Sequence, residues 1–329
     1  MAMKISIIST DALPTPPIDM SYGGIEVECW WLARGLAERG HSVTLLAKVG
    51  SMTPMNGRLI EVHDEHTAYR HIEGMDFDAV IDFSHDKAMS VAHPEWPQVN
   101  CHQVMSLMGS GVNPVLISHG QHDTKMPSVK CEIVYQHIDL NLYKPNYGER
   151  QPYFLTMAQI IEEKRIDWSI RVALEAGVPL KVRGPWWGDS RYMDMLREMA
   201  QGHPEIDLGD SVGGQEKLDL LRNARGLLHF PGAKDFCEAG SIITLEALAS
   251  GTPVVLSDNG VHREYVKNGL NGWMVNSIED AVLIVKSGLV GDIDKHECRK
   301  SVEWAGYQAM AQEYEVLCQR VASGERWNV

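Results

Sequence analysis

The chain has 329 residues, of which 44% are hydrophobic and 22% charged, a length and composition typical of a globular protein with two domains. Its 30 Lys and Arg against 44 Asp and Glu give a net charge of −14, which argues against nucleic acid or an anionic membrane as the main partner. The six cysteines form no Cys-x-x-Cys pair, and no run of about 18 apolar residues occurs. We therefore expect a cytoplasmic protein without membrane insertion.

The first 48 residues predict a strand, a loop, a helix and a second strand. Residues 4–9 form a β-branched run, and residues 42–47 form the next one. Between them, Gly23 and Gly24 open a helical pattern that reaches Ala37. The glycines do not fit G-x-G-x-x-G, so the dinucleotide-binding fingerprint is absent, and a glycine pair by itself is typical of a tight turn.

Histidines end two later strands of the first half. Residues 78–85 form a buried strand that ends at His85, and His102 lies at the end of the run 99–103. Because ligands bind at the carboxyl ends of strands in such sheets, His102 is a candidate site residue, with a buried structural histidine as the alternative. The acidic and histidine run 63–66 predicts a solvated loop, since adjacent side chains seldom converge on one ion.

The second half starts a new sheet after residues 146–152, which have the composition of a linker. Strand and helix patterns then alternate as in a second doubly wound domain. The adjacent Trp186 and Trp187 follow a strand; they could stack on a sugar or base, or cover a domain edge. Helical spacing returns from about Trp304 to Val321.

The most informative stretch runs from 233 to 257. Glu238 and Glu246 are eight positions apart, a helix begins near Gly240, and a buried strand starts after Gly251. The free N–H groups and positive dipole end of a glycine-led helix start suit a phosphate. One short element could thus hold a phosphate and offer two carboxylates to hydroxyl groups, although an ordinary capped helix has the same pattern.

The spacing Glu238-x7-Glu246, with the Ala-Leu-Ala-Ser-Gly-Thr-Pro-Val-Val that follows from 247, resembles the signature of the family 4 retaining glycosyltransferases. The similarity continues through a glycine-rich stretch from Gly260 to Gly272, and Gly23-Gly24-x-Glu26 resembles a loop of the same family. This resemblance implies the α/β GT-B architecture, two doubly wound Rossmann-like domains facing a central cleft. We place an acceptor-side domain at 1–147, with a C-terminal helix at about 308–329 packing back on it, and a domain that binds the nucleotide sugar at 148–307.

The resemblance also implies the activity: retaining, metal-independent transfer of a hexosyl group from a nucleoside-diphosphate sugar to a hydroxyl of a small molecule or glycan, with no cofactor. The catalytic residues would then be Glu238, His102 and Lys164, of which Glu238 and His102 would contact the transferred sugar. Lys164 and the N–H groups of the helix start would bind the diphosphate, and Glu246 would accept hydrogen bonds from the ribose. The full set of donor-binding candidates is Gly23, Gly24, Gln159, Lys164, Arg165, Arg183, Gly240, Ser241, Ile242, Ile243 and Glu246.

The chain departs from the family at the residues expected to meet the diphosphate. Gln159 stands where the family has arginine, and Arg165 follows Lys164 where the family has glycine. Glutamine can hydrogen-bond a phosphate but brings no charge. The second hypothesis is therefore a GT-B protein that binds nucleotide or glycan, or supports a partner subunit, without turnover. A GT-B epimerase or phosphorylase is a third. The donor base, the sugar, the acceptor and the oligomeric state do not follow from the sequence.

Overall fold

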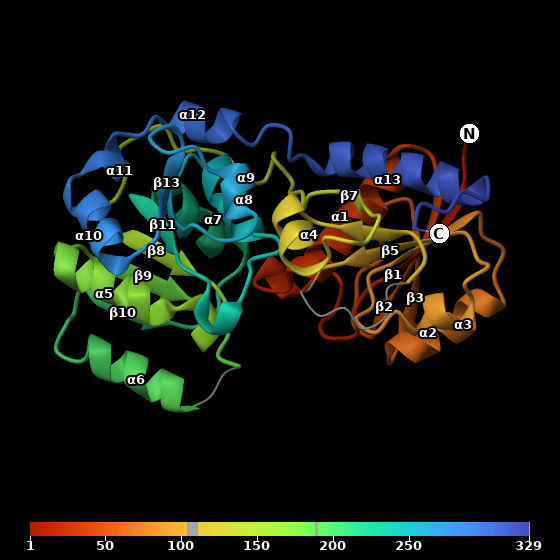
Figure 1. The fold of residues 1–329 in the computed structure, drawn as a ribbon, viewed down its shortest axis with the longest axis horizontal. Helices are drawn as coiled ribbons and strands as arrows, with labels where there is room; N and C mark the ends of the chain where they lie inside the picture. Colours follow the sequence, from red (N-terminus) through yellow and green to blue (C-terminus); the bar gives the residue numbers. More distant parts are fainter. Residues whose placement is uncertain (104–110, 188–189, 329) are drawn as a thin grey trace. The chain divides into compact units, whose positions relative to one another are not determined.

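The computed structural model describes residues 1–103, 111–187 and 190–328, and the chain divides into two compact units (Figure 1). The first unit comprises Met1–Asp139 and Ala305–Val329, and the second comprises Leu140–Trp304. The divisions fall at 139 and 305, compared with the predicted 147 and 308. Arg299 accounts for the first difference, because its guanidinium donates to the carbonyls of Leu140 (2.9 Å) and Tyr143 (2.6 Å) and thereby ties the segment after Asp139 to the second unit.

The first unit is built on a seven-stranded parallel sheet with the order β3-β2-β1-β4-β5-β6-β7. Its strands are β1 (Lys4–Ile8), β2 (Ser42–Lys48), β3 (Arg58–Val62), β4 (Ala79–Asp82), β5 (Gln98–His102), β6 (Pro114–Leu116) and β7 (Glu132–Ile133). Its helices are η1 (Ile18–Met20), α1 (Gly24–Glu38), α2 (Glu65–Glu73), α3 (Ala88–Ala92), α4 (His119–Lys125) and α13 (Tyr307–Ala322).

Alternate side chains of β1 contribute to the hydrophobic clusters on the two opposite faces of this sheet. Ile5 and Ile7 pack in one cluster with residues of α1 and α13, whereas Ile8 packs in the other with residues of α2. Figure 1 shows α13, in blue, running beside α1, and the rings of Trp31 and Tyr307 stack between these helices at 5.1 Å. The C-terminal helix therefore completes the core of the first unit.

The second unit has a six-stranded parallel sheet with the order β10-β9-β8-β11-β12-β13. Its strands are β8 (Phe154–Met157), β9 (Leu180–Arg183), β10 (Ile206–Gly209), β11 (Gly226–His229), β12 (Val254–Ser257) and β13 (Gly272–Val275). Its helices are η2 (Glu162–Lys164), α5 (Ile166–Ala176), α6 (Ser190–Ala200), α7 (Gly214–Asn223), η3 (Ala233–Asp235), α8 (Ile242–Ala249), α9 (His262–Tyr265), α10 (Ile278–Lys286), α11 (Leu289–Asp292) and α12 (Lys295–Lys300).

The predicted pair of doubly wound domains is confirmed, because each unit carries a parallel sheet whose order reverses direction beside its first strand. That reversal lies between β1 and β4 in the first unit and between β8 and β11 in the second. None of the helices in the described part of the chain is both long and apolar enough to span a bilayer.

Candidate active site

The carboxyl ends of β8 and β11 are the topological switch point of the second unit, where the loops after neighbouring strands part and leave room for a ligand. The loop after β8 carries Lys164, and the loop after β11 carries Glu238. Although 74 positions separate them in sequence, the Lys164 ammonium lies 2.6 Å from Glu238 Oε2. The topology thus brings together the lysine and the first glutamate that the sequence singled out.

Glu238 is buried and the Lys164 side chain is 16% exposed, so little water screens this ion pair. Burial by itself raises the pKa of the Glu238 carboxyl, but Lys164 and then His229 lower it more, so the net pKa lies well below the ordinary range. Glu238 is therefore a carboxylate at neutral pH. The Lys164 ammonium also lies 4.7 Å from the centre of the Phe236 ring, a cation–π contact.

Two histidines that the sequence did not single out lie behind this pair. His229 ends β11 with Nε2 at 3.6 Å from Glu238 Oε2, and the His262 ring meets it edge-on with the ring centres 5.6 Å apart. Burial lowers the pKa of both, to about 4 for His262, where the neighbouring His229 adds to the effect. Both rings are neutral at pH 7. The position of His229 at the carboxyl end of a buried strand was the signal that could have identified it.

The start of α8 offers backbone donors, as the sequence predicted for 240–243. Ser241 is the N-cap, and its carbonyl accepts from the N–H groups of Thr244 (3.1 Å) and Leu245 (3.3 Å). In such a first turn the N–H groups of Ile242 and Ile243 have no partner within the helix. Gly240, Ile242 and Ile243 are partly exposed, so these donors can meet an anion.

Gly260 fixes the loop that carries Glu238. Its φ is +51°, and an added Cβ would lie 2.1 Å from the carbonyl oxygen of Glu238. Next to it, Asn259 Oδ1 accepts from the Glu238 N–H at 3.1 Å, and the Val261 N–H donates to the Glu238 carbonyl at 3.0 Å. The turn after β12 therefore positions the backbone of Glu238 from both sides.

Glu246 lies in the second turn of α8 and is only 2% exposed. Its Oε1 accepts from the Lys217 ammonium at 2.8 Å and from the Tyr143 hydroxyl. Neither partner was identified from the sequence. The local sequence pattern does not indicate either contact, because Lys217 lies on α7 and Tyr143 on the irregular segment before β8.

The other basic candidates make contacts within the second unit. The Arg165 guanidinium donates to the Gly232 carbonyl at 2.8 Å and lies 4.5 Å from the Trp168 ring centre. Arg183 pairs with Asp207 at 2.6 Å. Gln159 lies partly buried in the loop directly after β8. Of the candidate cations of this unit, Lys164 is the one that meets Glu238.

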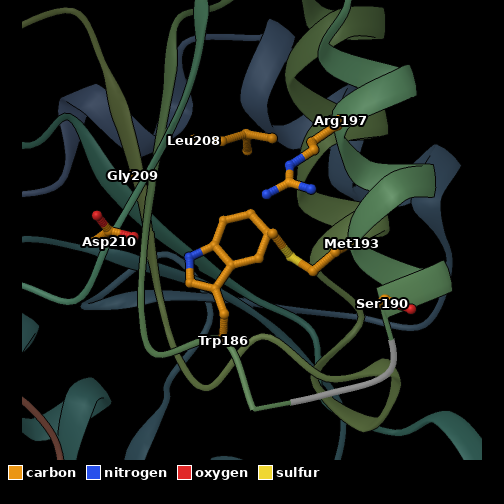
Figure 2. A pocket seen from close by; sticks show the side chains of 7 residues that line it. All are labelled: Trp186, Ser190, Met193, Arg197, Leu208, Gly209 and Asp210. Carbon is orange, nitrogen blue, oxygen red and sulfur yellow. The ribbon is translucent and has the colours of Figure 1, made fainter.

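A hollow of about 600 Å³ lies at the carboxyl ends of β9 and β10. Figure 2 shows the Trp186 indole at its centre, with Met193 and Arg197 of α6 facing the ring and Asp210 across from them. The Arg197 guanidinium is 5.3 Å from the centre of that ring. The neighbouring Trp187 is 56% exposed. Trp186 thus offers a planar face beside a charged group, which fits a flat heterocycle.

In the first unit, the loops after β1 and β4 meet at the corresponding switch point. Gly23 is the N-cap of α1 with φ +112°, and a Cβ there would lie 2.7 Å from Pro17 and 2.8 Å from Glu26. Glu26 is buried and accepts from the Thr10 hydroxyl. Gly24 begins the helix behind this turn, so the glycine pair brings the backbone close to the end of β1.

His102 ends β5 in the first unit and is buried. Burial, with a smaller effect of Lys87, lowers its pKa to about 3, so the imidazole is neutral at pH 7. Lys87 is itself buried, and its ammonium donates to the carbonyls of Asp82 (2.9 Å) and Ser84 (2.5 Å). The sequence did not single out Lys87.

Within the described residues, one group could hold a metal ion. Asp11, Glu65 and His85 of the first unit have ligand atoms that all lie within 4.8 Å of one another. The His85 ring and backbone N–H already contact the Glu65 carboxylate at 3.0 to 3.1 Å. That hydrogen bond raises the pKa of His85 against the opposing effect of burial. A metal ion would have to displace this proton.

Comparison with known proteins identifies the second unit. Residues 141–287 match the family model described as glycosyl transferases group 1. These residues form a group 1 glycosyltransferase domain. The predicted relationship is therefore confirmed at the level of the group, and the finer assignment to family 4 stays a prediction.

The whole chain matches solved glycosyltransferases. It aligns with AviGT4, a glycosyltransferase involved in avilamycin A biosynthesis, with a TM-score of 0.85 and 23% identity over 99% of both chains. It also aligns with the sucrose-phosphate synthase of Thermosynechococcus elongatus, with a TM-score of 0.77 and 13% identity over 98% of this chain and 100% of that one. The predicted GT-B fold is thereby confirmed.

A curated relative matches a shorter segment. The GtfA subunit of the UDP-N-acetylglucosamine–peptide N-acetylglucosaminyltransferase of Streptococcus pneumoniae serotype 4 (strain ATCC BAA-334 / TIGR4) is 25% identical over 136 residues. These cover 40% of this chain and 26% of the subunit, so the match spans about a quarter of that relative's length.

Proposed function

We propose that this glycosyltransferase moves a hexosyl group from a nucleoside-diphosphate sugar to an acceptor hydroxyl, with retention of configuration and without a metal ion. The observation that carries the proposal is the ion pair between Lys164 and the buried Glu238 at the switch point of the group 1 domain, with the start of α8 following Glu238 in the chain. A cation and free N–H groups stabilise the charge that a departing diphosphate gains, and a carboxylate beside them can accept from a sugar hydroxyl.

Each residue has a role in this scheme. Lys164 and the N–H groups of Ile242 and Ile243 bind the diphosphate, whose negative charge grows as it leaves. Glu238 then accepts from a hydroxyl of the transferred sugar, and Glu246 accepts from the ribose. The strand ends of the first unit, with His102 and the Gly23 turn, supply the acceptor side. As a neutral imidazole, His102 can accept or donate one hydrogen bond without adding charge.

The reaction balances without a further reactant. The bond between the anomeric carbon and the diphosphate oxygen breaks, and the acceptor oxygen bonds to the same carbon on the same face. The acceptor proton passes to the released diphosphate. The hollow beside Trp186 is our candidate for the nucleobase, since an indole face and a guanidinium suit a planar heterocycle.

A uridine donor is the first to test. The pneumococcal relative is named for UDP-N-acetylglucosamine, and Anabaena HepE, to which this chain aligns with a TM-score of 0.69 and 14% identity over 98% of this chain and 99% of that one, was solved in complex with UDP-glucose. We extend these donors to this protein as a proposal only.

The experiment is a thermal-shift panel with UDP, GDP, ADP and TDP. A ligand at about 100 times its dissociation constant stabilises a protein by roughly 2.7 kcal/mol, which a melting curve resolves. We expect one nucleotide to raise the melting temperature, Lys164→Ala to abolish that shift, and Lys286→Ala, which removes an exposed lysine of α10, to leave it intact. Release of that nucleotide from its sugar conjugates, with NMR of the product's anomeric proton, then tests transfer and retention.

One observation favours a second function, binding without turnover. Arg165 and Arg183 are both engaged with neighbouring groups, and Gln159 carries no charge, so Lys164 would face the diphosphate without a second side-chain cation from this set. A nucleotide that binds while none of its sugar conjugates releases the nucleoside diphosphate would support this second function. A panel without any shift would contradict transfer from a nucleoside-diphosphate sugar, and a protein that binds a glycan or supports a partner subunit would then be the leading hypothesis.

A further inference from the structure

A buried trio in the second unit joins three elements around one carboxylate. Glu246 of α8, Lys217 of α7 and Tyr143 of the segment before β8 are 2%, 8% and 3% exposed. Lys217 Nζ lies 2.8 Å from Glu246 Oε1 and 5.9 Å from the Tyr143 ring centre, and the Tyr143 hydroxyl donates to the same Oε1. The lysine balances the buried charge of the glutamate.

The backbone of Tyr143 is also held in place. Nη1 of Arg299 in α12 donates to the Tyr143 carbonyl at 2.6 Å and to the Ala249 carbonyl at 3.2 Å. Ala249 is the last residue of α8. The tyrosine and the helix that carries Glu246 are therefore fixed to the same guanidinium, so the hydroxyl reaches Glu246 from a rigid support.

The two oxygens of the Glu246 carboxylate are consequently unequal. Oε1 has two lone pairs and two donors, so its capacity is filled. Oε2 accepts from none of the described residues, yet it is not one of the fully enclosed polar atoms. The carboxylate thus has one occupied oxygen and one available oxygen, and its rotation is prevented by two hydrogen bonds.

We propose that Tyr143 and Lys217 are positioning residues that orient Oε2 of Glu246 toward the vicinal diol of the donor's ribose. This inference rests on the proposed function, in which Glu246 binds the ribose. A single fixed oxygen can accept from the 2′ and 3′ hydroxyls, so the trio sets the preference for a ribonucleotide over a nucleotide without these hydroxyls.

The test compares UDP with 2′,3′-dideoxy-UDP by isothermal titration calorimetry on the full chain, or the corresponding pair if the nucleotide panel selects another base. Tyr143→Phe keeps the ring that packs against Lys217 and removes only the hydroxyl. The matched control is Tyr153→Phe, which removes a hydroxyl that donates to the Leu220 carbonyl at 2.9 Å in the same unit.

In the wild type we expect the dideoxy nucleotide to bind about tenfold more weakly or worse, as the loss of hydrogen bonds to a charged group implies. Tyr143→Phe should raise the dissociation constant of UDP by about tenfold and change that of the dideoxy nucleotide by no more than about twofold. The variant should therefore no longer discriminate between the two nucleotides. Tyr153→Phe should keep the wild-type ratio. A folded Lys217→Met variant should likewise bring the ratio of the two dissociation constants close to one.

Equal weakening of both nucleotides by Tyr143→Phe would mean that the trio only supports the fold, and it would overturn the inference. If Tyr143→Phe kept the wild-type ratio of the two dissociation constants, the inference would also be overturned, while the proposed function would remain intact. If no nucleoside diphosphate binds to the wild type, the proposed function fails first and this inference fails with it.

Discussion

At the scale of single residues, we propose a functional rather than a stabilising role for the pair of Lys164 and Glu238. A buried ion pair contributes little net stability, because each charge loses its hydration on burial. Here the pair lies 2.6 Å apart at the switch point of the group 1 domain, beside two neutral histidines. A lysine that pairs with a carboxylate before the donor arrives can transfer its hydrogen bonds to a diphosphate, whose negative charge is larger.

The two charges can be separated by mutation. Lys164→Met leaves Glu238 buried without a counter-charge, which we expect to destabilise the second unit by about 3–5 kcal/mol and to reduce turnover by two orders of magnitude or more. The double variant Lys164→Met, Glu238→Gln removes both charges, so melting temperature should recover while turnover stays low. Recovery of activity in the double variant, measured with the best donor, would contradict the role of the pair.

The buried histidines predict how stability responds to acid. Burial, followed by His229, holds the pKa of His262 at about 4, below its unfolded value of about 6.5. The stabilising contribution of the neutral ring is therefore present above pH 6.5 and is lost as the pH falls toward 4, at up to about 1.4 kcal/mol per pH unit. His262→Gln should flatten the dependence of the melting temperature on pH in this window. His203→Gln, at an exposed site, should keep the wild-type slope, and an equal slope in both variants would contradict the prediction.

At the scale of elements, Gly260 in the turn after β12 packs against the loop that carries Glu238. Gly260→Ala would place a methyl group 2.1 Å from the Glu238 carbonyl at a φ of +51°, so the loop must move. A displacement of about 1 Å at a reacting group can cost on the order of a hundredfold in rate. We expect Gly260→Ala to lower both the melting temperature and the turnover number.

Gly177→Ala provides the matched control for this turn. Gly177 ends α5 with φ +70° and has no atom within 4 Å of an added Cβ, so only the conformational cost of about 1 kcal/mol applies. Its turnover number should equal that of the wild type. If both alanine variants lost activity alike, strain in general rather than the position of Glu238 would explain the result.

The elements also show what the sequence could predict. Alternation, helical spacing and the Glu238-x7-Glu246 pattern sufficed for two doubly wound domains and for the element that carries both glutamates. The trio around Glu246 was not predictable, because Tyr143 and Lys217 have no local pattern and meet Glu246 only through the tertiary fold. The division after Asp139 likewise depends on a tertiary contact, since Arg299 donates to the Leu140 carbonyl from more than 150 positions away.

At the scale of the whole molecule, the charge distribution bears on whether transfer needs a metal ion. The chain has a net charge of −14, so a diphosphate must find its positive partner locally. In the proposed function that partner is Lys164 with the start of α8, and the Glu238 carboxylate already pairs with the lysine. Within the described residues, the one group suited to a metal ion, Asp11, Glu65 and His85, belongs to the first unit.

We therefore expect transfer to survive removal of divalent cations. Steady-state release of the nucleotide should stay within about twofold after dialysis against EDTA, because a lysine and helix N–H groups stabilise the leaving charge without exchangeable ions. Loss of activity that Mn²⁺ restores would contradict this. Asp11→Asn then locates the cause: if the variant no longer responds to Mn²⁺, the ion acts at the first unit's group, and if it responds fully, the ion travels with the diphosphate of the donor.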